Sequence, residues 1–88
     1  MKIRFDEHAL ERMQERGTTE DEVKAAIFEG KRFQAKQGRI GFRRTFCSET
    51  EWEGIICSAK QLEVIVAEKE AGWLVITVIV KYIMAGEP

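Results

Sequence analysis

The chain has 88 residues and a net charge of −1, with 14 lysine and arginine residues against 15 aspartate and glutamate residues. This length accommodates a single domain, 1–88, and the content of 44% hydrophobic and 33% charged residues excludes a disordered chain. A net charge near zero argues at first sight against a generic nucleic-acid-binding protein.

The cysteine content and the apolar runs indicate the compartment. Cys47 and Cys57 are too few for a disulfide-rich secreted scaffold, and whether they ever pair is left open. Charged residues begin at Lys2, so no apolar leader is predicted, and the most apolar run, 73–80, is far shorter than the roughly 20 residues of a membrane helix. We therefore expect a soluble cytoplasmic protein without a membrane partner.

Two short helices are predicted in the first third of the chain. Asp6 is an N-cap residue, Phe5 is placed to pack against Leu10, and Gly17 ends the first helix. The apolar stripe of this helix consists of Ala9, Leu10 and Met13. The second helix begins with a capping box and ends at Gly30, and its core face consists of Val23, Ala26 and Ile27. The capping box pairs Thr19 with Glu22.

The remainder of the chain has strand patterns. The predicted strands are 32–37, 39–46, 62–68 and 73–82, with 55–58 as a separate short strand or the start of the next one. Gly38 and residues 69–72 mark hairpin turns, residues 47–54 indicate a loop, and 73–82 is apolar on both faces, as in a central strand. The predicted fold is α+β: an N-terminal αα-hairpin on one face of a curved antiparallel sheet of three to five strands.

The first helix carries His8, Arg12 and Arg16 at intervals of four residues. Such residues lie on one side of a helix, here beside the apolar stripe, so they can line a groove. Histidine moves protons near neutral pH and guanidinium groups bind phosphate oxygens, a combination suited to a phosphate ester. A solvated helix face remains open as the other interpretation. It would pair the arginines with acids of the same helix, namely Glu7, Glu11 and Glu15.

A basic run follows the helices. It holds six cations and no acid, with phenylalanines between them: Lys31, Arg32, Lys36, Arg39, Arg43 and Arg44. Such a run is typical of a sheet that contacts RNA, but equally of an edge hairpin kept soluble by cations. Arg39 and Arg43 fall on one face and Arg44 on the other. Because residues 1–46 carry +3 and 47–88 carry −4, the near-zero net charge is a cancellation, and it no longer excludes RNA.

The C-terminal strands add two polar candidates. Thr77 interrupts an apolar run, either as an ordinary strand residue or as a functional one, and Lys60 is a candidate cation at a strand edge. No paired metal-ligand spacing, glycine-rich phosphate loop or nucleotide fingerprint occurs, so no metal and no cofactor are predicted.

The first helix, with the sequence His-Ala-Leu-Glu-Arg-Met-Gln-Glu-Arg-Gly from His8 to Gly17, resembles that of a family catalogued as domain of unknown function 4258. The Thr-Glu-Asp-Glu-Val segment after it and Val75-Ile-Thr-Val78 also match. The family is similar to the small RelE and ParE toxins, with two helices on a curved antiparallel sheet. That resemblance implies metal-independent RNA cleavage for some members and gyrase poisoning for others. The positions that match by motif are His8, Arg12, Arg16 and Thr77.

Two functions are predicted as alternatives. The first is a small metal-independent endoribonuclease of the toxin type, which cleaves RNA by attack of a 2′-hydroxyl on phosphate and is held by a small antitoxin-like protein. Its catalytic residues would be His8, Arg12, Arg16 and Thr77, and its RNA-binding residues Arg39, Arg43, Arg44 and Lys60. The second is a non-catalytic module of the same fold that binds nucleic acid or protein. The oligomeric state is left open.

Overall fold

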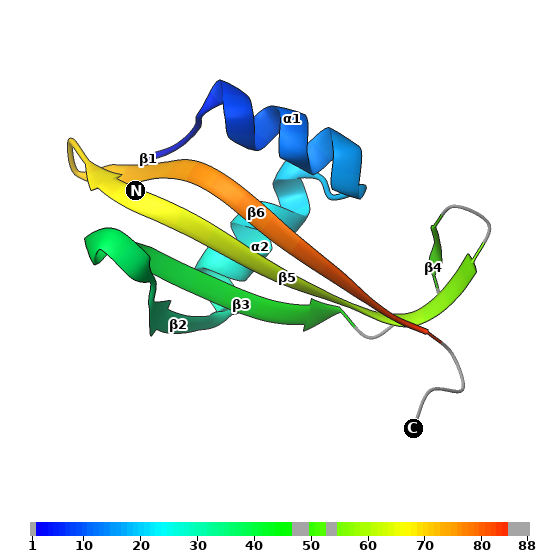
Figure 1. Cartoon of the computed structure of the whole chain (residues 1–88). Coiled ribbons are helices and arrows are strands. Elements are labelled where there is room, and N and C mark those ends of the chain that lie inside the picture. The colour runs from blue at the N-terminus through cyan, green and yellow to red at the C-terminus, as the bar shows by residue number, and fades with distance from the viewer. Residues whose placement is uncertain (1, 47–49, 53–54, 85–88) are drawn as a thin grey trace.

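The computed structural model describes residues 2–46, 50–52 and 55–84, with side chains described for 2–46 and 59–83. The elements in chain order are β1 (Lys2–Phe5), α1 (Glu7–Arg16), α2 (Glu20–Glu29), β2 (Lys31–Gln34), a 3₁₀ turn (Lys36–Gly38), β3 (Ile40–Phe46), β4 (Thr50–Trp52), β5 (Ile55–Lys69) and β6 (Gly72–Met84). The predicted α+β class is confirmed, and both helices precede the hairpins, as predicted (Figure 1).

The sheet is mixed, which corrects the predicted antiparallel sheet. Its strand order is β1-β6-β5-β3-β2, with β4 pairing β5 outside that path. The strand β1 pairs in parallel with the first residues of β6, whereas the other pairs are antiparallel. No strand was predicted before the first helix, because a strand of four residues is too short for a clear alternation and its partner lies at the other end of the chain. The prediction that 73–82 forms an interior strand is confirmed for its first residues, which lie between β1 and β5.

Local sequence signals set the helix ends as predicted. Asp6 caps α1 by accepting from the His8 backbone N–H at 3.0 Å, and Gly17 ends that helix in a left-handed conformation with φ of 76°. Thr19 and Glu22 form the predicted capping box of α2. The expected apolar stripe of α1 is wrong at Leu10, which is 42% exposed, because the helix rests on the sheet through the narrower Ala9 and Met13 face.

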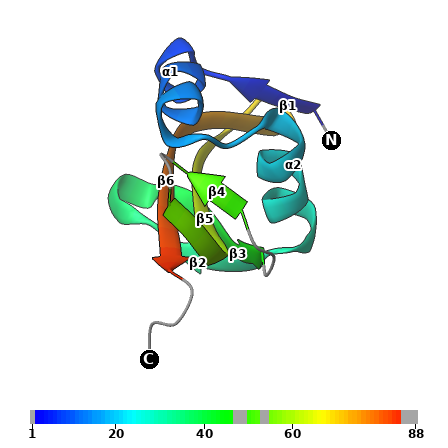
Figure 2. The same ribbon diagram turned by 90° about the vertical axis from the view of Figure 1, so that its right-hand side faces the viewer.

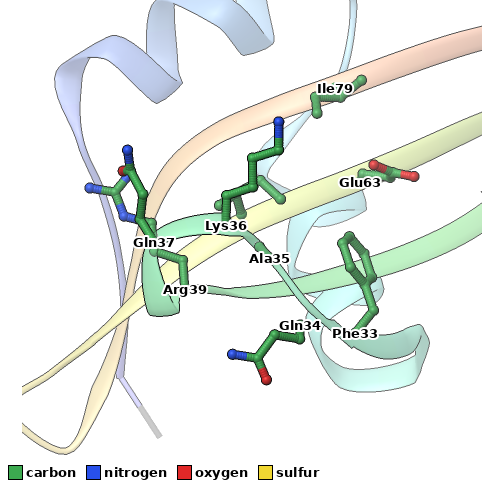
Figure 3. A pocket seen from close by; sticks show the side chains of 9 residues that line it. Phe33, Gln34, Ala35, Lys36, Gln37, Arg39, Glu63 and Ile79 are labelled. Atoms are coloured by element: carbon green, nitrogen blue, oxygen red, sulfur yellow. The ribbon is translucent and has the colours of Figure 1, made fainter.

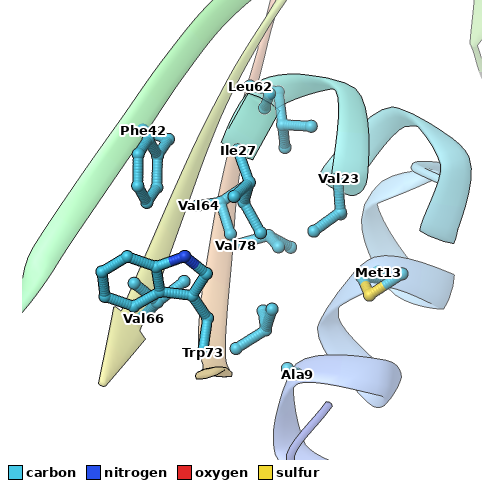
Figure 4. Close-up of a cluster of buried hydrophobic side chains, with 12 residues drawn as sticks. Ala9, Met13, Val23, Ile27, Phe42, Leu62, Val64, Val66, Trp73 and Val78 are labelled. Carbon is cyan, nitrogen blue, oxygen red and sulfur yellow. The ribbon is translucent and has the colours of Figure 1, made fainter. Parts of the chain in front are cut away.

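The core lies between the helices and one face of the sheet (Figures 2 and 4). From α2 it contains all three residues of the predicted face, and its fully buried valines and leucine come mainly from β5 and β6. The completely buried strand residues are Leu62, Val64, Val66 and Val75. The rings of Phe42 and Trp73 meet edge to face at 5.8 Å between centroids. Alternation along β5 therefore leaves its other residues on a face that no helix covers in the described part of the chain.

The hairpins follow the predicted turns, with one added strand. Gly38 lies in the β2–β3 connection with φ of 72°, and β5 and β6 are joined by Glu70 and Ala71. The predicted loop 47–54 contains β4, which pairs with the start of β5. Residues 55–58 are the start of β5, one of the two predicted alternatives. The question whether Cys47 and Cys57 pair lies outside the described residues.

Candidate functional site

The helix α1 is fixed against β6 at both of its ends. At its start, the Asp6 backbone N–H donates to the Val75 carbonyl at 3.0 Å, where β1 stops pairing with β6. At its end, the Tyr82 hydroxyl donates to the Arg16 carbonyl at 2.5 Å. Figure 1 shows α1 running beside β6 between these points. One side of the helix therefore faces the β6 edge that β1 leaves open.

A β-bulge in β6 decides which face Thr77 occupies. Val66 pairs with Val75, but the preceding Ile65 pairs with Thr77, so Ile76 is an extra residue on β6. Without the bulge, Thr77 would share the helix-covered face with Val75, two residues before it. The bulge moves Thr77 to the helix-free face and leaves Val78 in the core, where it is 4% exposed.

The predicted catalytic residues meet around one cavity. His8, Arg12 and Arg16 of α1 line it together with Thr77 and the following β6 residues, Val78, Ile79 and Val80. Its volume is about 360 Å³. We call it the α1–β6 cavity. Because no acid lines it among the described residues, two guanidinium groups give it a positive charge suited to a phosphate group.

The competing interpretation of α1, a face of internal ion pairs, is supported at one position only. Arg12 lies 3.8 Å from Glu15, a long ion pair between side chains that are 41% and 62% exposed. Within the described residues, neither His8 nor Arg16 has an ion-pair partner. These two groups and most of the Arg12 guanidinium therefore remain available to a ligand.

The three predicted RNA-binding arginines do not form one surface. Arg43 donates from Nε to Glu63 at 2.7 Å on the helix-free face, whereas Arg44 pairs with Glu29 of α2 on the opposite face. The predicted split between the faces is confirmed for Arg43 and Arg44. Arg39 lines a second cavity on the helix-free face, the sheet-face cavity, between the β2–β3 connection and strands β5 and β6 (Figure 3).

Lys60, the fourth predicted RNA-binding residue, is buried beneath the helices with 6% of its surface exposed. Its ammonium donates to Glu22 at 2.7 Å and to the Gly17 carbonyl at 3.3 Å. Burial raises the pKa of Glu22, but hydrogen bonds from Lys60, the Thr19 backbone and the Thr18 hydroxyl outweigh it and hold that pKa below its ordinary value. Lys60 thus joins β5 to the link between α1 and α2, and we leave it out of the proposed site.

Two contributors to the site, both on β6, were not among the predicted site residues. Tyr82 holds the end of α1, and Ile79, which is 51% exposed, lines both cavities. The sequence pattern does not assign Ile79 to a face of the sheet, because the bulge at Ile76 sets that face. Both residues lie on β6, whose apolar sequence on each face conceals the difference between core and cavity.

Comparisons with known proteins identify a family. The family model described as Domain of unknown function (DUF4258) matches residues 5–80. No curated protein and no solved structure matches the chain. In the described part of the chain, no helix is long and apolar enough to cross a membrane, and no group of three or more His, Cys, Asp or Glu residues is arranged to hold a metal ion. Since the match covers both helices and most of the strand that contains Thr77, the chain belongs to the DUF4258 family.

Proposed function

We propose that the protein is a small metal-independent endoribonuclease of the toxin type. The observation that carries the proposal is the α1–β6 cavity, in which His8, Arg12, Arg16 and Thr77 line one space although Thr77 lies far from the others in the sequence. An imidazole beside two guanidinium groups combines a proton acceptor with donors for phosphate oxygens. These are the groups that an RNA phosphodiester requires.

The proposed reaction is an internal transfer at phosphorus. The His8 imidazole takes the proton of a ribose 2′-hydroxyl, and the 2′-oxygen then bonds to the adjacent phosphorus. Arg12 and Arg16 stabilise the charge that develops on the phosphate oxygens. The bond from phosphorus to the 5′-oxygen breaks and that oxygen takes a proton from water, whose hydroxide takes the proton held by His8. The products are a 2′,3′-cyclic phosphate and a 5′-hydroxyl. The Thr77 hydroxyl donates a hydrogen bond to a phosphate oxygen and positions that group.

The test compares RNA cleavage by the wild-type protein with cleavage by single variants. We expect His8→Ala to lower the rate by about 10²–10⁴-fold, and Arg12→Ala or Arg16→Ala by about 10²-fold or more. Arg4→Ala is a matched control, because it removes an arginine that pairs with Glu70 outside the cavity. If the wild-type protein leaves RNA intact and its expression does not slow bacterial growth, the proposal is wrong.

A non-catalytic binding module is the second candidate. One observation favours it: among the described lining residues of the α1–β6 cavity, His8 is the one histidine, so no second imidazole is placed to protonate the leaving oxygen. In that case the cavity would hold a phosphate of RNA, or an acidic segment of a small antitoxin-like protein. His8→Ala would then leave binding largely intact, whereas Arg12→Ala would weaken it.

A further inference from the structure

The sheet-face cavity has the size and lining of a ligand pocket. Its volume is about 580 Å³, within the range of about 300–1,000 Å³ that is usual for small-molecule sites. Ile65 and Ile79 supply apolar walls, and Phe33 adds a ring that the Arg43 guanidinium overlies at 4.8 Å from the ring centroid. A Cβ at position 41 would meet the Phe33 ring at 2.2 Å, so Gly41 is what allows the ring to lie across β3. Apolar walls of this kind suit a flat aromatic group.

The sheet-face cavity adjoins the α1–β6 cavity. Ile79 lines both, and the register places Thr77 of the α1–β6 cavity opposite Ile65 of the sheet-face cavity. Adjacent strands are about 4.8 Å apart, so a ligand group beside Thr77 lies next to a ligand group beside Ile65. A phosphate between α1 and β6 would therefore leave its nucleoside next to the sheet-face cavity.

Three charged residues line the sheet-face cavity, and two of them, Glu63 and Lys36, have opposite hydrogen-bonding roles. In Figure 3 the carboxylate of Glu63 and the ammonium of Lys36 border the same space, with Ile79 beside them. Glu63 is the one acid that lines the cavity among the described residues. Arg43 occupies one position on Oε2 at 2.7 Å, which fixes the carboxylate and leaves most of its roughly four acceptor positions open.

These roles select one base. A carboxylate accepts hydrogen bonds only, so it requires two adjacent donors on a base edge, and guanine offers its N1–H and N2 amino group side by side. An ammonium donates only, and guanine presents the O6 acceptor beside those donors. Adenine and cytosine place an acceptor beside their amino group, and uracil has a single donor between two acceptors, so each sets an acceptor against Glu63.

We infer that the sheet-face cavity binds the guanine base of the nucleotide whose phosphate lies in the α1–β6 cavity, with Glu63 on N1–H and the amino group and Lys36 on O6. This inference rests on the proposed function, because it takes the ligand to be RNA. It makes Glu63 and Lys36 specificity-determining residues for cleavage at guanosine.

The experiment measures binding of the four nucleoside 3′-monophosphates by calorimetry, without any cleavage step. We expect the wild-type protein to bind guanosine monophosphate about tenfold more tightly than the other three. Glu63→Gln, which replaces one acceptor by an amide donor, should remove that preference, and Lys36→Ala should reduce it. Glu29→Gln is the matched control, because it alters an ion pair with an arginine of β3 on the other face of the sheet, and it should retain the preference.

The outcomes separate the inference from the proposed function. Equal affinities for the four nucleotides, or a preference that survives Glu63→Gln, would overturn the guanine site even if RNA is cleaved. Selective binding of guanosine monophosphate by a protein that cleaves no RNA would instead contradict the proposed nuclease and leave the guanine site in place. Lys36→Ala keeps the test decisive if Glu63→Gln unfolds, because Lys36 is an exposed residue of a turn.

Discussion

Replacing Lys60 by methionine should lower the free energy of unfolding and leave RNA binding at the proposed site unchanged. Lys60 is 6% exposed and its ammonium lies 2.7 Å from the Glu22 carboxylate, so the substitution removes one member of a buried ion pair. Loss of one partner from a buried pair costs about 3–5 kcal/mol. The Glu22 side chain is 27% exposed and keeps its bonds from Thr18 and the Thr19 backbone. We therefore place the cost of Lys60→Met lower, at about 2–3 kcal/mol.

The opposite substitution, Glu22→Leu, should cost more than Lys60→Met. It leaves the Lys60 ammonium buried with the Gly17 carbonyl at 3.3 Å as its remaining recorded partner among the described residues, and it removes the capping box. The expected cost is about 3–5 kcal/mol, a large part of the roughly 5–15 kcal/mol that stabilises a domain. The double substitution should cost about 2 kcal/mol less than the sum of the two single costs, because neither charge is then buried without its partner.

Urea denaturation measures these free energies of unfolding, and repeating it at several pH values tests the direction in which they change. The folded protein lowers the pKa of Glu22, so the stabilisation is present above the unfolded value of 4.5 and is lost as the pH falls through the lowered folded pKa. Glu22→Gln should remove that part of the acid sensitivity. A Lys60→Met variant as stable as the wild-type protein, but weaker in binding RNA, would refute this reasoning and return Lys60 to the RNA-binding set.

Three further perturbations test how the site is built. Tyr82→Phe removes the hydroxyl that donates to the Arg16 carbonyl and should cost about 1 kcal/mol while slowing cleavage; an unchanged rate would show that this bond does not position α1. Ala71→Gly should stabilise the β5–β6 turn by about 0.5–1 kcal/mol, since Ala71 has φ of 63°, and thermal unfolding would show no gain if that conformation carried no strain. Arg12→Ala should reduce the salt slope of RNA binding by about 0.7, as expected for one phosphate contact, and an unaltered slope would place the phosphate elsewhere.

Local signals in the sequence predict the helices and the alignment of His8, Arg12 and Arg16 along one of them. Asp6, Gly17 and the Thr19–Glu22 capping box act within a few residues of themselves, so the chain needs no tertiary contact to express them. The spacing of His8 and Arg12 is likewise a property of one helix.

The remaining features depend on partners that are remote in the sequence. The face of Thr77 is set by the bulge at Ile76, which only the pairing of β6 with β5 defines. The burial of Lys60 follows from its position opposite the link between the helices, which composition alone does not indicate. The parallel strand β1 requires β6 as its template. For the same reason, the sheet-face cavity and the role of Glu63 emerge only from the assembled sheet.

The most direct test of the central claim uses two RNA oligonucleotides that are identical except for one 2′-deoxy substitution at the cleaved nucleotide. The account predicts that the wild-type protein cleaves the all-ribose strand and leaves a 2′,3′-cyclic phosphate and a 5′-hydroxyl, that the deoxy position is not cleaved, and that His8→Ala is slower by about 10²-fold or more. Cleavage at the deoxy position, a 3′-hydroxyl product, or equal rates for the wild-type protein and His8→Ala would contradict it.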